Sequence, residues 1–572
     1  MEEKTVRCCG RGVSYALLLV LVLCGVLYLA KLGSWGLFDP DEGRYAEIPR
    51  EMVESGDWIT PHLDYVKYFE KPPLLYWFVA ATIRAFGEGE FAARLGCAVP
   101  AIFGILFVFC FARRTLGPRP ALYAAVILGT SLLYAAMGHS LTTDMLLSVL
   151  MAAAGLMWWL GSERPGRNWG QYAAAGGLLG LAILAKGPVA LVLMGGVVIV
   201  YTAWTRRWKA IFCPQMLGAL AVMSAVAVPW FVLVMRYNPD FAHFFFWVQH
   251  VERFLPAKAA AGATYATPSG EHAKPAYWFI LILIGGLLPW TGYLPAALRQ
   301  PWGVEASEAD VSPRRLRLFA LLWAGLIFAF FSASSCKLMP YILPVFPVLA
   351  IVLGAYFADA ESKRLTLPRW PAIAMGLFAI GGALAIPSLA HKSKDIPPSD
   401  LMPVVAAGVV VLVAWGATLI VVGLRRKPAF WALAGGLAAF LLTLICALPI
   451  AAPYKCIRKP ALHVAAELKP GDIVAQYRGL NQSLSYYTHQ RVMMLWGEGG
   501  PGTEILFGYQ TDPYGTEAWQ RNGDRAVEEL LRGKQRVFIV IGQKGRAEFE
   551  QRFGGLYKYF DENADRVFVV NR

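Results

Sequence analysis

The sequence FDPDEGRYAEIPREM, residues 38–52, gathers acidic groups, an arginine and a tyrosine within a few positions. It follows directly on Val13–Ala30, the first apolar run long enough to cross a bilayer. That run follows a basic N-terminal region, as a signal peptide would. Its length, and the lack of a small-residue cleavage site before Phe38, favour a signal-anchor span. Polar groups at the end of such a span face the membrane surface, so residues 38–52 predict a site there.

Within this stretch, the spacing of the polar residues predicts a short helix. Asp39 or Asp41 can cap it, with Glu42 in its first turn. If the helix starts there, Asp41, Arg44 and Tyr45 share one face, three and four residues apart. The pattern fits a capped interfacial helix with a local ion pair. It also fits a carboxylate held beside a guanidinium and a phenol for catalysis, and in that case Asp39 and Glu42 are structural.

The composition identifies a membrane protein with many spans. The chain has 572 residues, of which 57% are apolar and only 16% charged, with a mean hydropathy of +0.47. A soluble domain carries about 25% charged residues. The net charge of +14 does not indicate nucleic acid, because Lys and Arg collect in the cytoplasmic loops of membrane proteins.

Thirteen apolar runs predict thirteen transmembrane helices: Val13–Ala30, Phe91–Ala112, Ala121–Met137, Met145–Leu160, Tyr172–Ala185, Val189–Trp204, Met216–Met235, Ala276–Leu298, Leu318–Phe331, Leu338–Phe357, Trp370–Leu389, Leu401–Leu424 and Phe430–Ile450. A further run, Pro72–Phe86, is shorter than the roughly 20 residues of a crossing. If it does not cross and the N-terminus is cytoplasmic, the basic clusters all become cytoplasmic, as the positive-inside rule requires. They include Arg113-Arg114, Arg206-Arg207 with Lys209, and Arg425-Arg426-Lys427. We therefore expect Pro72–Phe86 to lie in the interface.

This topology places the unexpected charges on one face. The polar segments predicted to lie outside are 31–90, the turns at 139–144, 186–188 and 332–337, the loops 236–275 and 390–400, and the tail from residue 451. We expect residues 1–450 to form the membrane domain. Residues 451–572 have a soluble composition, and their alternating strand and helix patterns predict a small α/β domain. Strands are expected at 472–479, 535–542 and 566–570, and helices at 516–532 and 544–553.

Several ionisable residues stand at the outer ends of spans, where they are site candidates by default. Pro72-Pro73 fixes an extended entry that presents Glu70 and Lys71, although Lys71 could simply snorkel to the interface. Asp144 could equally lie in the first turn of a capped helix. The others are Lys186, Lys337 with Tyr341 one turn further on, and Arg253 and His250 in an aromatic-rich loop.

Cations that converge on one face would suit a phosphate or pyrophosphate group. Arg binds phosphate through two nitrogens and Lys binds it as a point charge. Nearby carboxylates would act as a base or position a nucleophile. His250 with Glu70 or Asp144 could hold a divalent metal such as zinc or magnesium, although no ligand spacing here is diagnostic of a metal cofactor.

Six motifs taken together resemble one family. They are FDPDEGRYAEIPREM, YFEKPPLLYW, TTDMLL, AKGP, FFFWVQHVERF and SSCKLMPYILP. The chain is similar, over residues 10–450, to the lipid A aminoarabinose transferases (undecaprenyl phosphate-α-4-amino-4-deoxy-L-arabinose arabinosyltransferases). These belong to the clan of the dolichyl-phosphate-mannose protein mannosyltransferases.

The resemblance implies a GT-C fold with about thirteen spans in the bacterial inner membrane and a periplasmic active site. It implies transfer of a sugar, expected to be 4-amino-4-deoxy-L-arabinose, from a polyprenyl (undecaprenyl) phosphate to a lipid A phosphate, which modifies lipopolysaccharide and confers resistance to polymyxin and cationic peptides. By motif, Asp41 would be the catalytic carboxylate. The substrate-binding residues would be Arg44, Tyr45, Tyr68, Glu70, Lys71, Asp144, Lys186, Arg253, Lys337 and Tyr341.

Two other functions fit parts of the sequence. An enzyme of the same clan could use another sugar, or a protein hydroxyl as acceptor. A lipid transporter would place its ionisable groups near the bilayer midplane, often across an inverted repeat. Here the charges stand at one face and no internal repeat is visible, which favours the transferase.

Overall fold

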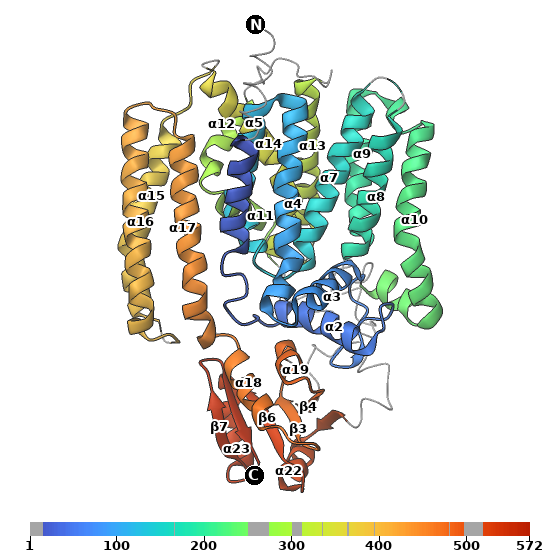
Figure 1. Cartoon of the computed structure of the whole chain (residues 1–572), viewed down its shortest axis with the longest axis vertical. Helices are drawn as coiled ribbons and strands as arrows, with labels where there is room; N and C mark the ends of the chain where they lie inside the picture. Colours follow the sequence, from blue (N-terminus) through green and yellow to red (C-terminus); the bar gives the residue numbers. More distant parts are fainter. Residues whose placement is uncertain are drawn as a thin grey trace.

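The computed structural model describes residues 15–164, 166, 168–249, 274–299, 312–334, 336–362, 365–393, 395–479, 481–496 and 519–571. A bundle of long helices forms most of the molecule, and a small sheet domain lies at one end of it (Figure 1). The short helices α2 and α3 lie between the bundle and this domain.

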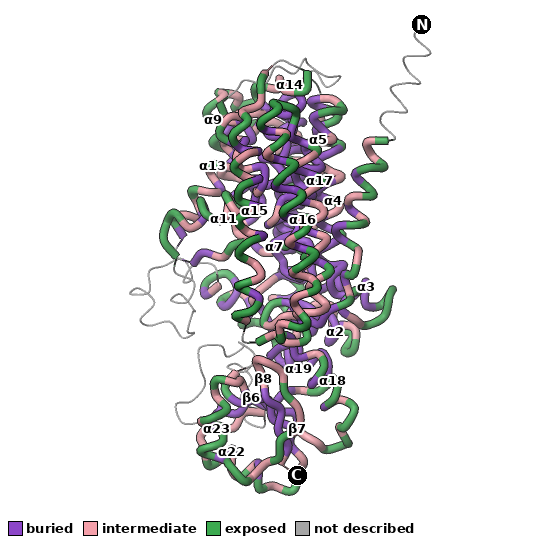
Figure 2. The backbone as a smooth tube through the Cα atoms, turned by 90° about the vertical axis from the view of Figure 1, so that its left-hand side faces the viewer, coloured by how far each residue is buried: buried purple, intermediate pink, exposed green. Residues whose placement is uncertain are grey.

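Eight helical segments are long and apolar enough to span a membrane. They are α4 (Glu90–Leu116), α7 (Thr143–Glu163), α10 (Pro214–Tyr237) with the preceding turn Trp208–Ala210, α13 (Pro313–Ala333), α14 (Phe346–Glu361) with the preceding turn Met339–Val345, α15 (Trp370–His391), α16 (Pro398–Leu424) and α17 (Phe430–Ala451). Among them, α7 and α14 are enclosed on almost all sides, whereas α15, α16 and α17 expose much of their surface (Figure 2).

The other predicted spans are shorter or broken. They comprise Tyr15–Leu29, α5 (Pro118–Thr130) with α6 (Leu132–Met137), α8 (Trp169–Lys186), α9 (Val189–Thr205), and α11 (Trp278–Gly286) with α12 (Leu294–Arg299). The chain turns by 106° between α11 and the segment that contains α12. Counted as one span, this pair brings the total in the described residues to nine. The polytopic helical fold is confirmed, and the number thirteen stays a prediction.

The stretch predicted to lie in the interface forms a helix too short to span. Helix α3 (Leu74–Phe86) has 13 residues, a length of about 20 Å against a hydrocarbon core of about 30 Å. It packs against α2 (Asp41–Ser55) and α4. A two-stranded hairpin, β1 (His62–Leu63) and β2 (Val66–Lys67), connects α2 to it.

The polar turns predicted to share one face do meet at one end of the bundle. The Leu141 amide donates to the Glu42 carboxylate (3.1 Å), which joins the turn before α7 to α2. Lys186, at the end of α8, pairs with Asp144 at the start of α7. Lys455 of the tail pairs with Asp395, in the turn before α16 (2.5 Å). Which side of the membrane this end faces stays a prediction.

A six-stranded sheet forms the C-terminal domain, in the order β5-β4-β3-β6-β8-β7. Strands β3 (Ile473–Tyr477), β4 (Val492–Trp496), β5 (Gln520–Asn522) and β6 (Val537–Gly542) run parallel, and Ala475 pairs with both Met493 and Ile539. Strand β8 (Arg566–Val570) is antiparallel to β6 and to β7 (Lys558–Glu562). The predicted strands at 472–479, 535–542 and 566–570 correspond to β3, β6 and β8.

Helices cover both faces of this sheet. α22 (Asp524–Arg532) and α23 (Arg546–Phe553) pack on one face through Val527, Leu531, Phe549 and Phe553. α18 (Arg458–Glu467) and α19 (Gln482–Thr488) cover the other face, and their buried residues belong to the same apolar core as the helix bundle. The sheet domain is therefore continuous with the bundle through α18 and α19.

Helix α2 contacts α19 so closely that only glycine fits at the crossing. The Asp39 carboxylate accepts hydrogen bonds from the Ser483 amide (2.9 Å) and hydroxyl. A Cβ on Gly43 would lie 2.4 Å from both the Asp39 carboxylate and the Ser483 nitrogen. The prediction that Asp39 or Asp41 caps α2 is wrong, because Pro40 is the N-cap and neither carboxylate caps the helix. Asp39 instead binds the C-terminal domain.

We expect Gly43→Ala to destabilise the protein, although Gly→Ala inside an exposed helix normally stabilises by about 1 kcal/mol. The new methyl must push α19 away from α2, because the atoms it meets are backbone and a carboxylate held in place. Gly435→Ala, in α17 with open space at its Cβ, is the matched control. Thermal unfolding in detergent, with limited proteolysis of the C-terminal domain, measures the effect. A Gly43→Ala melting temperature at or above that of the control would contradict the prediction.

Candidate functional site

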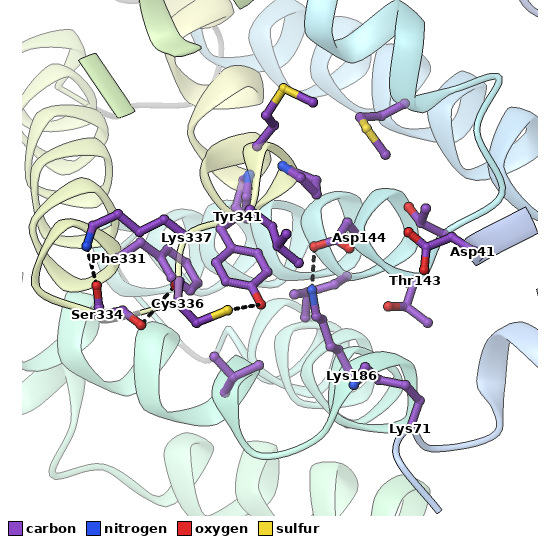
Figure 3. A pocket seen from close by; sticks show the side chains of 18 of the residues that line it. Asp41, Lys71, Thr143, Asp144, Lys186, Phe331, Ser334, Cys336, Lys337 and Tyr341 are labelled. Atoms are coloured by element: carbon purple, nitrogen blue, oxygen red, sulfur yellow. Dashed lines mark hydrogen bonds and ion pairs between the residues drawn. The ribbon is translucent and has the colours of Figure 1, made fainter. Parts of the chain in front are cut away.

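A cavity of about 570 Å³ opens at the end of the bundle where the polar turns meet, a size typical of small-molecule sites. Its walls come from α2, the segment before α3, the start of α7, the end of α8 and the segment before α14 (Figure 3). Nine of the eleven residues proposed from the sequence as catalytic or substrate-binding line it: Asp41, Arg44, Tyr45, Glu70, Lys71, Asp144, Lys186, Lys337 and Tyr341.

The first wall is the predicted face of α2. The helix begins at Asp41, so Asp41, Arg44 and Tyr45 point to the same side and all three line the cavity. Within the described residues, the exposed Asp41 carboxylate has no hydrogen-bond or ion-pair partner. Burial raises the pKa of Tyr45, and the negative charge of Asp41 raises it further. Tyr45 is therefore a neutral hydrogen-bond donor at physiological pH.

Arg44 is held from three directions. Its Nη1 lies 3.5 Å from the Tyr68 hydroxyl and 3.9 Å from the Glu70 carboxylate, and its Nε donates to Oε1 of Gln482 (3.4 Å). Tyr68, also proposed from the sequence, thus supports Arg44 from behind the cavity surface. Gln482 belongs to α19, so the C-terminal domain helps to hold a cavity residue. Sequence reasoning missed Gln482, and the only signal was a polar run, Asn481–Ser483, in a domain treated as separate.

The opposite wall carries an ion pair. Lys186 donates to Asp144, and its Nζ lies 4.7 Å from the centre of the Tyr341 ring. In the view of Figure 3 this pair lies between Asp41 and Tyr341. The Asp144 charge is matched locally, which leaves Asp41 as the described lining carboxylate without a bound cation.

Lys71 and Lys337 lie in different parts of the cavity wall. Nζ of Lys71 donates to the Glu70 carbonyl (3.1 Å). Lys337 is buried and donates to the Ser334 carbonyl, so its ammonium turns away from Asp41 (Figure 3).

Two proposed residues, Arg253 and His250, lie outside the described residues, and so does most of the loop 236–275. Glu70, the other metal candidate, lines the cavity. Among the described residues, no group of three or more His, Cys, Asp or Glu side chains could hold a metal ion. The metal site therefore stays a prediction.

The cavity has an excess of positive charge. Its described lining includes five cations and three carboxylates, because Lys274 joins the four cations proposed from the sequence. Sequence reasoning missed this lysine and the polar lining residue Ser140. It gave no role to Thr142, Thr143 and Gln249, which also line the cavity, although they stand in the motifs TTDMLL and FFFWVQHVERF. An excess of Lys and Arg suits an anionic ligand such as a phosphate monoester.

The two remaining acids of the motif have structural contacts. Glu42 is buried and pairs through both oxygens with Arg94 of α4. Asp39 is half-buried against Ser483, and desolvation raises its pKa although the hydrogen bonds from Ser483 oppose the shift. Neither residue lines the cavity, as expected if Asp39 and Glu42 have structural roles.

Comparison with known proteins identifies the family. A profile of the dolichyl-phosphate-mannose-protein mannosyltransferases matches residues 70–232. The undecaprenyl phosphate-alpha-4-amino-4-deoxy-L-arabinose arabinosyl transferase of Aeromonas hydrophila is 31% identical over 497 residues, which cover 84% of this chain and 85% of the relative. The chain belongs to this arabinosyl transferase family. It is therefore a membrane glycosyltransferase.

Other members of the family are similarly close. The enzyme of Pseudomonas aeruginosa is 33% identical over 79% of this chain and 78% of its own length. That of Edwardsiella ictaluri is 36% identical, but the alignment covers only 64% of this chain and 63% of the relative. Among solved structures, ArnT from Cupriavidus metallidurans bound to undecaprenyl phosphate superposes with a TM-score of 0.79 and 29% identity, over 97% of this chain and 98% of that one. The GT-C-type arabinosyltransferase fold extends through the C-terminal domain.

Proposed function

We propose that this protein transfers 4-amino-4-deoxy-L-arabinose from undecaprenyl phosphate to a phosphate group of lipid A. The observation that carries the proposal is the cavity, in which the Asp41 carboxylate, without an ion-pair partner among the described residues, faces an excess of Lys and Arg at one end of a membrane bundle. Family membership supports the sugar, and the similar Cupriavidus enzyme was crystallised with undecaprenyl phosphate.

The reaction is a single displacement at the anomeric carbon. An oxygen of the acceptor phosphate attacks this carbon, and undecaprenyl phosphate leaves with the electrons of the broken C–O bond. Lys186, Lys71 and Arg44 would stabilise the charge on the leaving phosphate, an electrostatic contribution that is often the largest in catalysis. Asp41 would orient the acceptor and take any remaining proton. The lipid tails of both substrates stay in the bilayer, which accounts for a site at the end of the bundle.

The same proposal places the cavity on the periplasmic side of the inner membrane. Its support is the positive-inside rule, because the basic clusters following α4, α9 and α16 lie at the ends of these helices away from the cavity. We divide the chain into a catalytic membrane domain, residues 1–450, and a periplasmic domain, residues 451–572. The contact between Gln482 and Arg44 gives the second domain a part in shaping the site.

The test uses the purified full chain with radiolabelled undecaprenyl-phosphate aminoarabinose and lipid A. We expect label in the lipid A fraction, with mass spectrometry showing one added aminopentose on a phosphate. Parallel reactions replace the donor by a polyprenyl-phosphate hexose and the acceptor by a peptide with Ser and Thr hydroxyls. Preferential transfer in either parallel reaction would overturn the proposal and support another activity of the same clan.

A further inference from the structure

A second cavity, of about 650 Å³, lies at the opposite end of the bundle. It is lined by described residues at the α7–α8 and α9–α10 connections, opens to the surface, and shares no lining residue with the catalytic cavity. Arg164, Arg206, Arg207 and Lys209 all contribute to its lining, and no Asp or Glu does so among the described residues.

One carboxylate lies nearby, and it is already neutralised. The buried Glu163 pairs with Arg207 (2.5 Å) and Arg315 (2.9 Å) and accepts a hydrogen bond from the Tyr201 hydroxyl (2.7 Å). Within the described residues, Arg164, Arg206 and Lys209 have no ion pair. Three cations therefore remain available around one cavity.

The positive potential of this cavity comes from its side chains. Helices α8 and α10 begin here and helices α7 and α9 end here, so the partial charges of the helix ends balance. The walls are fixed by hydrogen bonds: the Asn168 amide donates to the carbonyls of Gly161 (3.0 Å) and Arg164 (2.8 Å), and the Tyr172 hydroxyl donates to that of Ala210 (2.9 Å). The cavity wall is therefore held in place, unlike a solvated cytoplasmic loop whose Lys and Arg residues reflect only the positive-inside rule.

Exposed aromatic residues flank the cavity at the ends of the membrane helices. Trp169, Trp208 and Phe212 are 45%, 47% and 77% exposed, and Trp208 is also part of the cavity lining. Tryptophan is enriched where a protein meets the headgroup region of a bilayer. A ligand with an anionic head and an apolar body fits this combination better than a soluble anion does. Basic pockets of this kind between membrane helices bind phosphate headgroups.

We propose that this cavity binds the phosphodiester headgroup of an anionic phospholipid from the leaflet opposite the catalytic site. Arg164, Arg206 and Lys209 bind the phosphate, and Trp208 contacts the glycerol and the upper acyl chain. The lipid would tie the α7–α8 and α9–α10 connections together, and α7 and α8 carry the Asp144–Lys186 pair at their other ends. This site is independent of the sugar and acceptor used in the reaction.

The test measures thermal unfolding of the purified full chain in detergent while dioleoylphosphatidylglycerol is titrated. We expect a saturable rise in melting temperature that weakens as ionic strength is raised. In the triple variant Arg164→Gln, Arg206→Gln, Lys209→Gln, the half-maximal effect should need at least tenfold more lipid. The double variant Arg206→Gln, Lys209→Gln changes only exposed side chains. Its half-maximal effect should need an intermediate amount of lipid, and this variant replaces the triple variant if the triple variant does not fold.

The matched control is Arg425→Gln, Arg426→Gln, Lys427→Gln. It removes the same charge from the exposed α16–α17 turn, at the same end of the bundle, and should respond to the lipid as the unmodified protein does. An equal response of the triple variant and this control would overturn the proposal. Zwitterionic phosphatidylcholine and inorganic phosphate are the comparison probes. Stabilisation by inorganic phosphate equal to that by phosphatidylglycerol would overturn the lipid as the ligand.

Discussion

Asp41→Asn is expected to lower kcat for sugar transfer by about 10²–10⁴-fold, the range for loss of a positioned acid–base group. The reason is the state of its carboxylate, which has no ion-pair partner within the described residues, whereas Asp144 is paired with Lys186 and Glu70 lies 3.9 Å from Arg44. With lipid A as the acceptor we expect a loss near the lower end of this range, because a phosphate monoester has its second pKa at about 6 and needs little help to ionise. A hydroxyl acceptor would give the larger loss.

Donor binding should survive this substitution. Asparagine has nearly the shape of aspartate, and loss of a negative charge leaves the cavity more favourable to phosphate. We therefore expect the Kd for undecaprenyl phosphate to stay the same or to decrease while transfer is lost. Glu54→Gln, on the same helix but outside the cavity, is the control and should keep its activity. Transfer at the unmodified rate by Asp41→Asn would show that Asp41 is not the catalytic carboxylate.

The sequence was sufficient to predict one wall of the cavity because its geometry is local. Asp41, Arg44 and Tyr45 are brought together by the helical repeat alone. The meeting of the turns at Asp144 and Lys186 followed from the alternation of spans, since consecutive connections must lie at alternate ends of a bundle. Both steps need only the helix period and the thickness of a bilayer.

Contacts between distant segments were beyond such reasoning. Gln482 binds Arg44 across 438 residues of sequence, and nothing in either local pattern indicates the other. The hydropathy of residues 276–298 predicts one span, yet the chain turns by 106° within this run. Hydropathy measures the preference of a segment for an apolar environment and is insensitive to its direction. The sequence pattern also does not predict the direction of the Lys337 side chain, whose ammonium donates to the Ser334 carbonyl.

Arg94→Met is expected to destabilise the protein strongly. Arg94 is fully buried, and its guanidinium donates to both oxygens of Glu42 (3.0 and 2.8 Å) and to the carbonyls of Leu32, Trp35 and Gly36 (3.1, 2.8 and 2.8 Å). Removing one member of a buried ion pair costs about 3–5 kcal/mol, because the other charge stays buried without a partner. The three carbonyls also lose their donor. We expect a large fall in melting temperature in detergent.

A second variant separates the loss of charge balance from the loss of packing. In Arg94→Met, Glu42→Gln the buried charge is gone, so part of the lost stability should return, as replacement of both members of buried pairs has shown elsewhere. Recovery should be incomplete, because Glu42 also accepts hydrogen bonds from the amides of Phe38 (3.0 Å) and Leu141 (3.1 Å). Arg84→Met, at an exposed position of α3 where the guanidinium lies over the Trp58 ring (5.3 Å), is the control. If Arg94→Met melted at the temperature of this control, the ion pair could not be what holds the start of α2, and with it Asp41, against α4.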